Sequence, residues 1–162
     1  MRNNGFTLAE MVAVIAILMV LSLLSAPFVR GYIDDSYNGK AQIFLKQLNE
    51  ARLNFERDYP GTKVSGEISY TAPTGECDLN SIYGQTDLVV GPEVLFKCHY
   101  LQIPTDLEGR YTFKVGDAAE CESCDKWAKA SLLGGDNAGV YKSKCACINN
   151  LGELKKQDVD IN

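Results

Sequence analysis

The chain is short of several residue types on which catalytic and nucleic-acid-binding sites depend. It has one histidine, His99, which leaves little room for multi-histidine chemistry, and no Ser or Asp motif points to a triad around it. No glycine-rich phosphate loop, internal repeat or low-complexity linker occurs in the 162 residues. The formal net charge of −5 provides no broad basic surface for nucleic acid, although a local basic patch remains compatible with it. We therefore expect a structural protein with no active site, no cofactor and no resident metal.

The most informative segment that is present is the apolar run Phe6–Val29. As a helix it would extend about 36 Å, which is enough to cross a bilayer core of about 30 Å. Arg2 precedes it, and positive charge there favours a cytoplasmic N-terminus, so the C-terminal part should lie outside. A cleavable secretory signal and a simple signal anchor are the alternatives. Leu24-Ser25-Ala26 is a poor signal-peptidase site, however, and neither alternative requires the acidic Glu10.

Gly5-Phe6-Thr7-Leu8-Ala9-Glu10 resembles the G-F-T-L-x-E processing motif of type IV pilins and their pseudopilin relatives. The resemblance implies that a membrane-bound prepilin peptidase cuts between Gly5 and Phe6, and that Phe6 is then N-methylated. It also implies that Glu10 of one subunit meets the Phe6 amine of its neighbour in a filament. In a low-dielectric helix bundle both charges need such a partner. The resemblance covers only the N-terminal helix, and the remainder of the chain matches no pattern of the family.

The position of Pro27 is also similar to that in the family, in which many members carry a proline at this distance from the cleavage site. Proline removes one backbone donor and loosens a helix locally. The resemblance implies a helix break at Pro27 in the assembled filament, and a simple kink is the alternative for an isolated subunit.

The helical pattern continues beyond Pro27 to about Asp58 and ends at Pro60-Gly61. An apolar stripe at helical spacing is formed by Tyr37, Ala41, Phe44, Leu48, Ala51 and Phe55. Charged residues on the other faces, with Lys46–Glu50 and Arg52–Glu56 at pairing distance, are interpreted as a solvated surface. One helix from Phe6 to Asp58 would be about 80 Å long. A small head cannot bury such a helix, so its first half needs lipid or neighbouring copies.

The remainder of the chain predicts a compact β-rich head. Alternating apolar residues predict strands over 64–70, 94–100, 111–115 and 140–148, and a short helix is expected from Asp117 to Gly134. The fold class is therefore α+β, with a long N-terminal helix packed against an antiparallel β-sheet head, which agrees with the ladle shape of the pilin family. We divide the chain into a leader (1–5), a membrane-spanning or filament-core half-helix (6–29), an amphipathic continuation (30–58) and a disulfide-rich head (59–162).

Six cysteines lie in the C-terminal part, at Cys77, Cys98, Cys121, Cys124, Cys145 and Cys147. An even count behind an apolar N-terminal segment favours structural disulfides in an oxidising compartment. One guess pairs Cys121 and Cys124 with Cys145 and Cys147, which leaves Cys77–Cys98. Zinc binding by the CESC and CAC motifs, and a redox-active Cys121/Cys124 pair, are the alternatives. Haem attachment is disfavoured because Asp125 follows Cys124.

Two acidic segments, residues 133–139 and 158–162, could bind calcium, but neither has EF-hand spacing, so a loop and a tail are preferred. Our hypothesis is a structural subunit of a type IV pilus or a related filament, with itself, prepilin peptidase, membrane lipid and the inner-membrane assembly machinery as partners. It would begin in the bacterial inner membrane and end in a periplasmic or extracellular filament. The alternatives are a type II secretion pseudopilin and, from another class, a membrane-anchored thiol oxidoreductase that uses Cys121 and Cys124.

Overall fold

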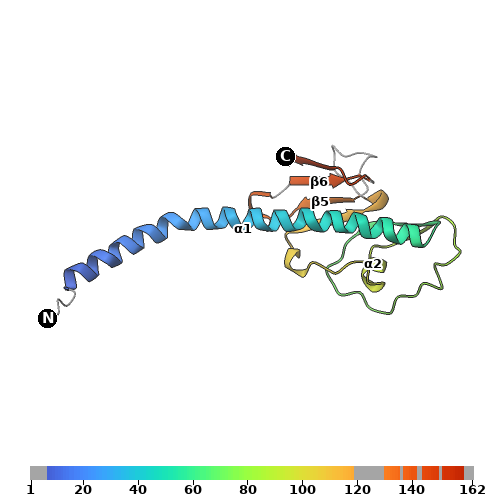
Figure 1. Ribbon diagram of the computed structural model, residues 1–162, viewed down its shortest axis with the longest axis horizontal. Coiled ribbons are helices and arrows are strands. Elements are labelled where there is room, and N and C mark those ends of the chain that lie inside the picture. Colours follow the sequence, from blue (N-terminus) through green and yellow to red (C-terminus); the bar gives the residue numbers. More distant parts are fainter. Residues whose placement is uncertain (1–6, 119–129, 136, 142–143, 150, 159–162) are drawn as a thin grey trace, which may run out of the picture.

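One long helix, α1 (Leu8–Asp58), runs through the molecule and carries a head on its C-terminal half (Figure 1). The computed structural model describes residues 7–118, 130–135, 137–141, 144–149 and 151–158. Thr7 is the N-cap of α1, and the helix ends at Asp58, with Tyr59 as its C-cap just before Pro60 and Gly61. Gly61 has a φ of 92°, a left-handed conformation that glycine adopts without steric cost. The predicted long helix is therefore confirmed from Leu8 onward.

In the single chain, α1 continues through Pro27 without a break. A proline removes one backbone donor, while the turns on either side keep their hydrogen bonds, so a helix can bend there without ending. Figure 1 shows α1 curving away from the axis of its head-bearing half toward the N-terminus. Local unwinding at Pro27 in an assembled filament stays a prediction.

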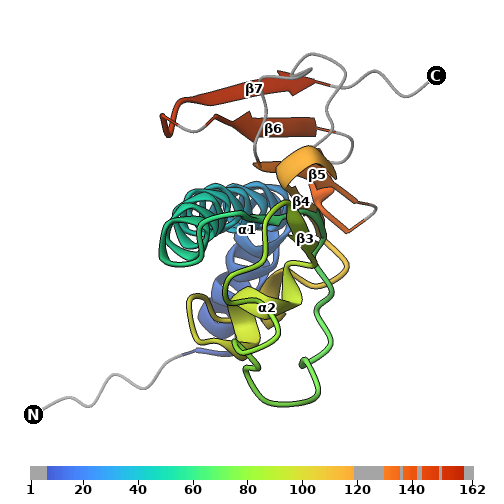
Figure 2. The same ribbon diagram turned by 90° about the vertical axis from the view of Figure 1, so that its right-hand side faces the viewer.

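The head is built on a five-stranded antiparallel sheet that packs against the C-terminal half of α1 (Figure 2). In spatial order its strands are β2 (Gly66–Glu67), β4 (Tyr111–Val115), β5 (Ala130–Gly134), β6 (Lys144–Ile148) and β7 (Leu154–Asp158). A separate parallel pair is formed by β1 (Thr62–Val64) and β3 (Leu88–Val90). The short helical elements are α2 (Glu93–Lys97) and the 3-10 turns Thr105–Leu107, Gly116–Ala118 and Gly139–Tyr141. The expected α+β architecture is confirmed.

Several predicted elements of the head are wrong in type or extent. Residues 94–100, expected as a strand, contain α2, in which the consecutive residues Leu95 and Phe96 are both buried. Residues 130–134, expected at the end of a short helix, form β5, because pairing with β4 and β6 overrides local helix preference. Most of that expected helix lies outside the described residues. The strand expected over 140–148 begins only at Lys144, and the one expected over 64–70 is divided between β1 and β2.

The core lies between α1 and the sheet and confirms the apolar stripe of the helix. Ala41, Phe44, Leu48, Ala51 and Phe55 are all buried. The ring of Phe44 meets that of Phe113 on β4 edge to face, with centroids 4.8 Å apart. Such aromatic contacts add to the free energy of burial, so this stripe fixes which face of α1 the head covers.

Candidate assembly and processing site

The first described turn of α1 is closed by a reciprocal cap between Thr7 and Glu10. The backbone N–H and the hydroxyl of Thr7 both donate to Oε2 of Glu10, at 2.8 Å each. The backbone N–H of Glu10 donates to the Thr7 hydroxyl at 3.3 Å. This is a capping box, which satisfies donors that the start of a helix would otherwise leave unpaired. This role of Glu10 is additional to the filament-assembly role expected from the motif, and the T-x-x-E spacing of Thr7 and Glu10 is its signal in the sequence.

The apolar start of α1, from Leu8 to Ser25, has no buried side chain in the single chain. Every side chain from Thr7 to Ser25 is exposed, and most of them are apolar. By length and composition, α1 is the one helix among the described residues that could cross a membrane. An apolar surface of this extent is unstable in water and requires lipid or another protein surface.

The second half of α1 holds the head through a buried polar network that sequence analysis did not expect. Arg52, interpreted above as part of a solvated face, is only 4% exposed. Its guanidinium lies 2.7 Å from Glu56 and 3.3 Å from the side-chain oxygen of Asn49. Glu56 in turn accepts the backbone N–H of Val64 on β1, at 3.1 Å. The Glu56 carboxylate and the Asn49 side-chain oxygen accept from the two terminal nitrogens of Arg52, and the carboxylate pairs its charge, which offsets the cost of burying the guanidinium.

A second group of contacts fastens the middle of α1 to Arg110, directly before β4, and to Tyr141, between β5 and β6. The Arg110 guanidinium lies 4.0 Å from the ring centroid of Tyr37 and 3.9 Å from a carboxylate oxygen of Asp34. The Tyr141 hydroxyl donates to Asp35, and this hydrogen bond raises the pKa of Tyr141 above its ordinary value. Together with the network around Arg52, these contacts fasten the head to residues 34–56 of the helix.

The cysteines of the described residues are oxidised. Cys77 and Cys98 form a disulfide that ties the loop after β2 to the end of α2. Cys145 and Cys147 are also disulfide-bonded. The pairing guessed for them involves Cys121 and Cys124, which lie outside the described residues, so both that pairing and the thiol-oxidoreductase hypothesis stay predictions. One disulfide that encloses a loop of this length typically stabilises a fold by about 3 kcal/mol.

The remaining candidate residues are not gathered into a site by the described part of the fold. His99 is exposed, with a φ of 60°. Within the described ranges, no group of three or more His, Cys, Asp or Glu side chains could hold a metal ion. Gly5 and Phe6 lie outside the described residues, and so does most of the acidic tail.

Comparison with known families identifies the N-terminal segment. The family model described as the prokaryotic N-terminal methylation motif matches residues 1–26. The chain thus carries the prepilin signature of type IV pilin and pseudopilin precursors, which indicates a structural, pilin-type protein. No curated protein and no solved structure matches the chain significantly. The motif implies processing by a prepilin peptidase and polymerisation into filaments, and together with the long apolar helix it fits anchoring in the inner membrane before assembly.

Proposed function

We propose that the chain is a structural subunit of a type IV pilus or a related extracytoplasmic filament. It is made as a precursor, cleaved after Gly5, N-methylated on Phe6 and polymerised through the first half of α1. The observation that carries this proposal is the methylation motif joined directly to a helix whose apolar side chains are exposed from Leu8 to Ser25. A filament core built from such half-helices removes that surface from water without lipid.

Glu10 is suited to receive the new amine of a neighbouring copy. A carboxylate has about four acceptor positions, and both hydrogen bonds from Thr7 go to Oε2. Among the described residues, no hydrogen bond reaches Oε1. The cap therefore holds the carboxylate in place while one oxygen stays open to the Phe6 amine of another subunit. A cationic amine brought to this oxygen inside an apolar bundle would be paired, which removes the large penalty of an isolated buried charge.

The orientation proposed for the precursor places its N-terminus in the cytoplasm and its head outside. Arg2 before the apolar run supports this orientation, as does the disulfide-bonded head. The subunit would therefore enter the filament from the inner membrane and leave the head exposed on its surface. A pseudopilin of a type II secretion filament would share these properties and differ in where its filament ends.

The proposal is tested by mass spectrometry of filaments sheared from the cell surface. The expected subunit begins at N-methylated Phe6, lacks the first five residues and carries its cysteines as disulfides. Gly5→Leu should leave the leader attached and prevent the subunit from entering filaments. A mature Phe6 terminus in the Gly5→Leu protein, or a native protein that keeps its leader and never polymerises, would contradict the proposal. Filaments confined to the periplasm would instead assign the chain to the secretion type.

A further inference from the structure

The tip of the β6–β7 hairpin displays one leucine to solvent. Leu151 is 83% exposed, although leucine is among the residues most often buried in folded proteins. The turn that carries it is ordered by Asn149, whose side-chain oxygen accepts the backbone N–H groups of Leu151 at 2.9 Å and of Glu153 at 3.0 Å. The Asn149 amide donates to the Glu153 carboxylate at 2.7 Å. A segment held in such a turn loses little conformational entropy when it binds a partner.

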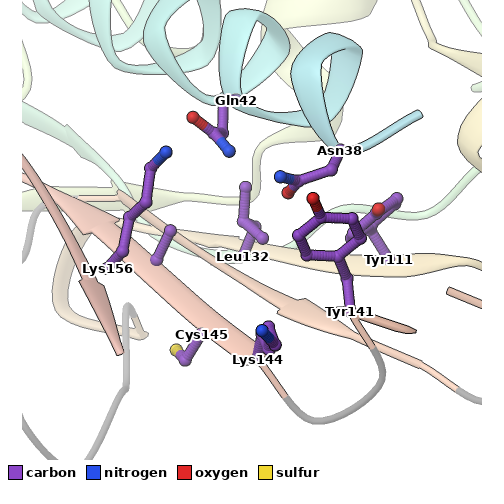
Figure 3. A pocket seen from close by; sticks show the side chains of 9 residues that line it. Asn38, Gln42, Tyr111, Leu132, Tyr141, Lys144, Cys145 and Lys156 are labelled. Atoms are coloured by element: carbon purple, nitrogen blue, oxygen red, sulfur yellow. The ribbon is translucent and has the colours of Figure 1, made fainter. Parts of the chain in front are cut away.

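The inner side of this hairpin is occupied by contacts with α1. The Asn49 amide on the helix donates to the backbone carbonyl of Asn149 at 3.1 Å. Figure 3 shows Lys156 pointing from β7 toward Gln42 on α1, across a cavity of about 210 Å³. The tip and the outer side, where Leu151 is exposed, are therefore the parts of the hairpin that another molecule can reach.

A groove of about 350 Å³ lies between residues 67–74 and α2. Its apolar surface comes from Ala72, Pro73 and Phe96, and its charged side chains are Glu67, Glu93 and Lys97. Figures 1 and 2 both show the β6–β7 hairpin and α2 on opposite sides of α1. Two parallel copies placed side by side therefore bring the hairpin of one copy toward the groove of the other.

The levels of the hairpin and of α2 along the helix agree with the stagger of the proposed filament. When the Phe6 amine of one copy meets Glu10 of the next, the first copy is shifted toward its head by about 6 Å, the rise of four helical residues. Within one chain the hairpin is held at Asn49, whereas Tyr100, which follows α2, packs on Phe55, about 9 Å farther along the helix. The hairpin of the shifted copy thus arrives near the level of α2 in its neighbour.

The charges of the hairpin and of the groove are complementary. Beside its tip the hairpin carries Glu153 and Lys155, both of them exposed. Of the charged groups at the groove, Glu67 lies opposite Lys114 on β4, which leaves Glu93 and Lys97 of α2 to face an incoming hairpin. Lys155 can meet Glu93 and Glu153 can meet Lys97, an arrangement that favours one register of the two surfaces.

We propose that Leu151 of one subunit inserts into the groove beside α2 of the neighbouring subunit. This inference rests on the proposed function, because it concerns contacts between copies in a filament. The contact joins two different surfaces of the same chain, so it repeats from copy to copy, as a helical filament requires. It is small, and it therefore adds to the packing of the helices without replacing it.

The test is photocross-linking in filaments that mix the unchanged chain with a copy in which p-benzoylphenylalanine replaces Leu151. We expect a covalent dimer whose cross-link, located by mass spectrometry, joins position 151 to residues 67–74 or 93–97 of another copy. The matched control carries the same probe in place of Leu133, which is 41% exposed on the central strand β5, and it should give no cross-link to the groove.

The outcomes separate this contact from the filament itself. Filaments in which position 151 cross-links elsewhere, or to nothing, would overturn the contact and leave the proposed function intact. An unchanged chain that forms no filaments would remove both proposals.

Single substitutions measure how much the contact contributes. Leu151→Ser should be cleaved normally but enter filaments several-fold less, because serine offers the groove little apolar surface. Leu151→Met keeps an apolar side chain of similar size and should assemble like the unchanged protein. Because the side chain is exposed in the single chain, both variants should unfold in urea like the unchanged protein, which excludes a folding defect. Equal assembly of the two variants would count against the contact.

Discussion

At the scale of single residues, Glu10 has two roles. The sequence motif predicts its role in filament assembly, and the structure adds a role in capping α1. In the single chain it closes the first turn of α1 with Thr7, and in the proposed filament it also meets a neighbouring amine. The two roles use different atoms, since the cap engages Oε2 and the backbone N–H. They can therefore be separated by changing one partner at a time.

The first prediction separates the cap from the contact between subunits. Glu10→Ala should still be cleaved after Gly5 but should enter filaments poorly, because the neighbouring amine loses its carboxylate partner. Thr7→Val removes the capping hydroxyl and keeps that carboxylate, so it should assemble far better than Glu10→Ala. The measurement is the amount of processed subunit in the sheared-filament fraction relative to the membrane fraction. Equal loss in the two variants would assign the role of Glu10 to helix capping alone.

The second prediction concerns Tyr111 and alkaline pH. Burial raises its pKa from 10 to about 12, so between these values the unfolded chain releases the proton and the folded chain keeps it. The free energy of unfolding should therefore fall as the pH rises through this window. In Tyr111→Phe the fall should be shallower, and the stability at neutral pH should not decrease, because the hydroxyl that is lost has no partner.

Denaturant unfolding of the detergent-solubilised chain at a series of pH values measures this effect. Tyr83→Phe is the matched control, because Tyr83 is 79% exposed. Identical pH dependence of Tyr111→Phe and the unchanged protein would contradict the buried position of that hydroxyl.

At the scale of elements, the C-terminal half of α1 contacts the head through its apolar stripe and through a second row of buried side chains next to that stripe. Leu45, Asn49 and Arg52 lie one position beyond stripe residues and are buried as well. The buried face is therefore wider than the stripe predicted from spacing. Its polar members connect the helix to β1 and to the turn before β7, where the Asn49 amide donates to the carbonyl of Asn149 at 3.1 Å.

The third prediction tests this polar network. Glu56→Ala should lower the free energy of unfolding by about 3 kcal/mol, because it leaves the buried Arg52 charge without its carboxylate. Asp106→Ala is the control, since it breaks the Lys40–Asp106 ion pair, whose side chains are 54% and 50% exposed. Exposed ion pairs contribute little to stability, so this variant should unfold close to the unchanged protein. A similar loss in both variants, measured by urea unfolding, would contradict a special role for the buried pair.

At the scale of the whole molecule, the chain divides into a part that is folded by its own contacts and a part that needs other molecules. The head and residues 34–56 of α1 share one core and two sets of polar contacts. The half-helix before them contributes no buried side chain between Thr7 and Ser25. The membrane insertion and polymerisation proposed above would thus involve a segment that the head does not bury.

The fourth prediction follows from this division. A chain that lacks residues 1–29 should fold, remain monomeric in the absence of detergent and keep the unfolding free energy of the full chain within about 0.5 kcal/mol. Size-exclusion chromatography and urea unfolding provide the two measurements. An unfolded or aggregated product would show that the first half of the helix supports the head, against the exposure of its side chains.

The local features of the protein could be predicted from the sequence, because each depends on residues close together in the chain. The processing motif, the apolar segment, the helical stripe and the strand Tyr111–Val115 all belong to this group. The secondary structure of residues 93–97 and 130–134 could not be predicted in this way, because it depends on contacts with residues far away in the chain. The last strand, β7, was missed for the same reason, since its Lys155-Lys156 pair reads as polar surface and its strand form depends on pairing with β6.

The sequence by itself determined that this chain has a long apolar N-terminal helix with a methylation motif at its start and a cysteine-bearing α+β head, since periodicity, charge and motif spacing act locally. Only the tertiary structure decided that Arg52 is buried and that the buried hydroxyl of Tyr111 has no hydrogen-bond partner among the described residues. It also decided that the β6–β7 hairpin and the groove beside α2 lie on opposite sides of α1. These features depend on how distant segments pack, and the free energy of a polar group is set by the neighbours that packing brings to it.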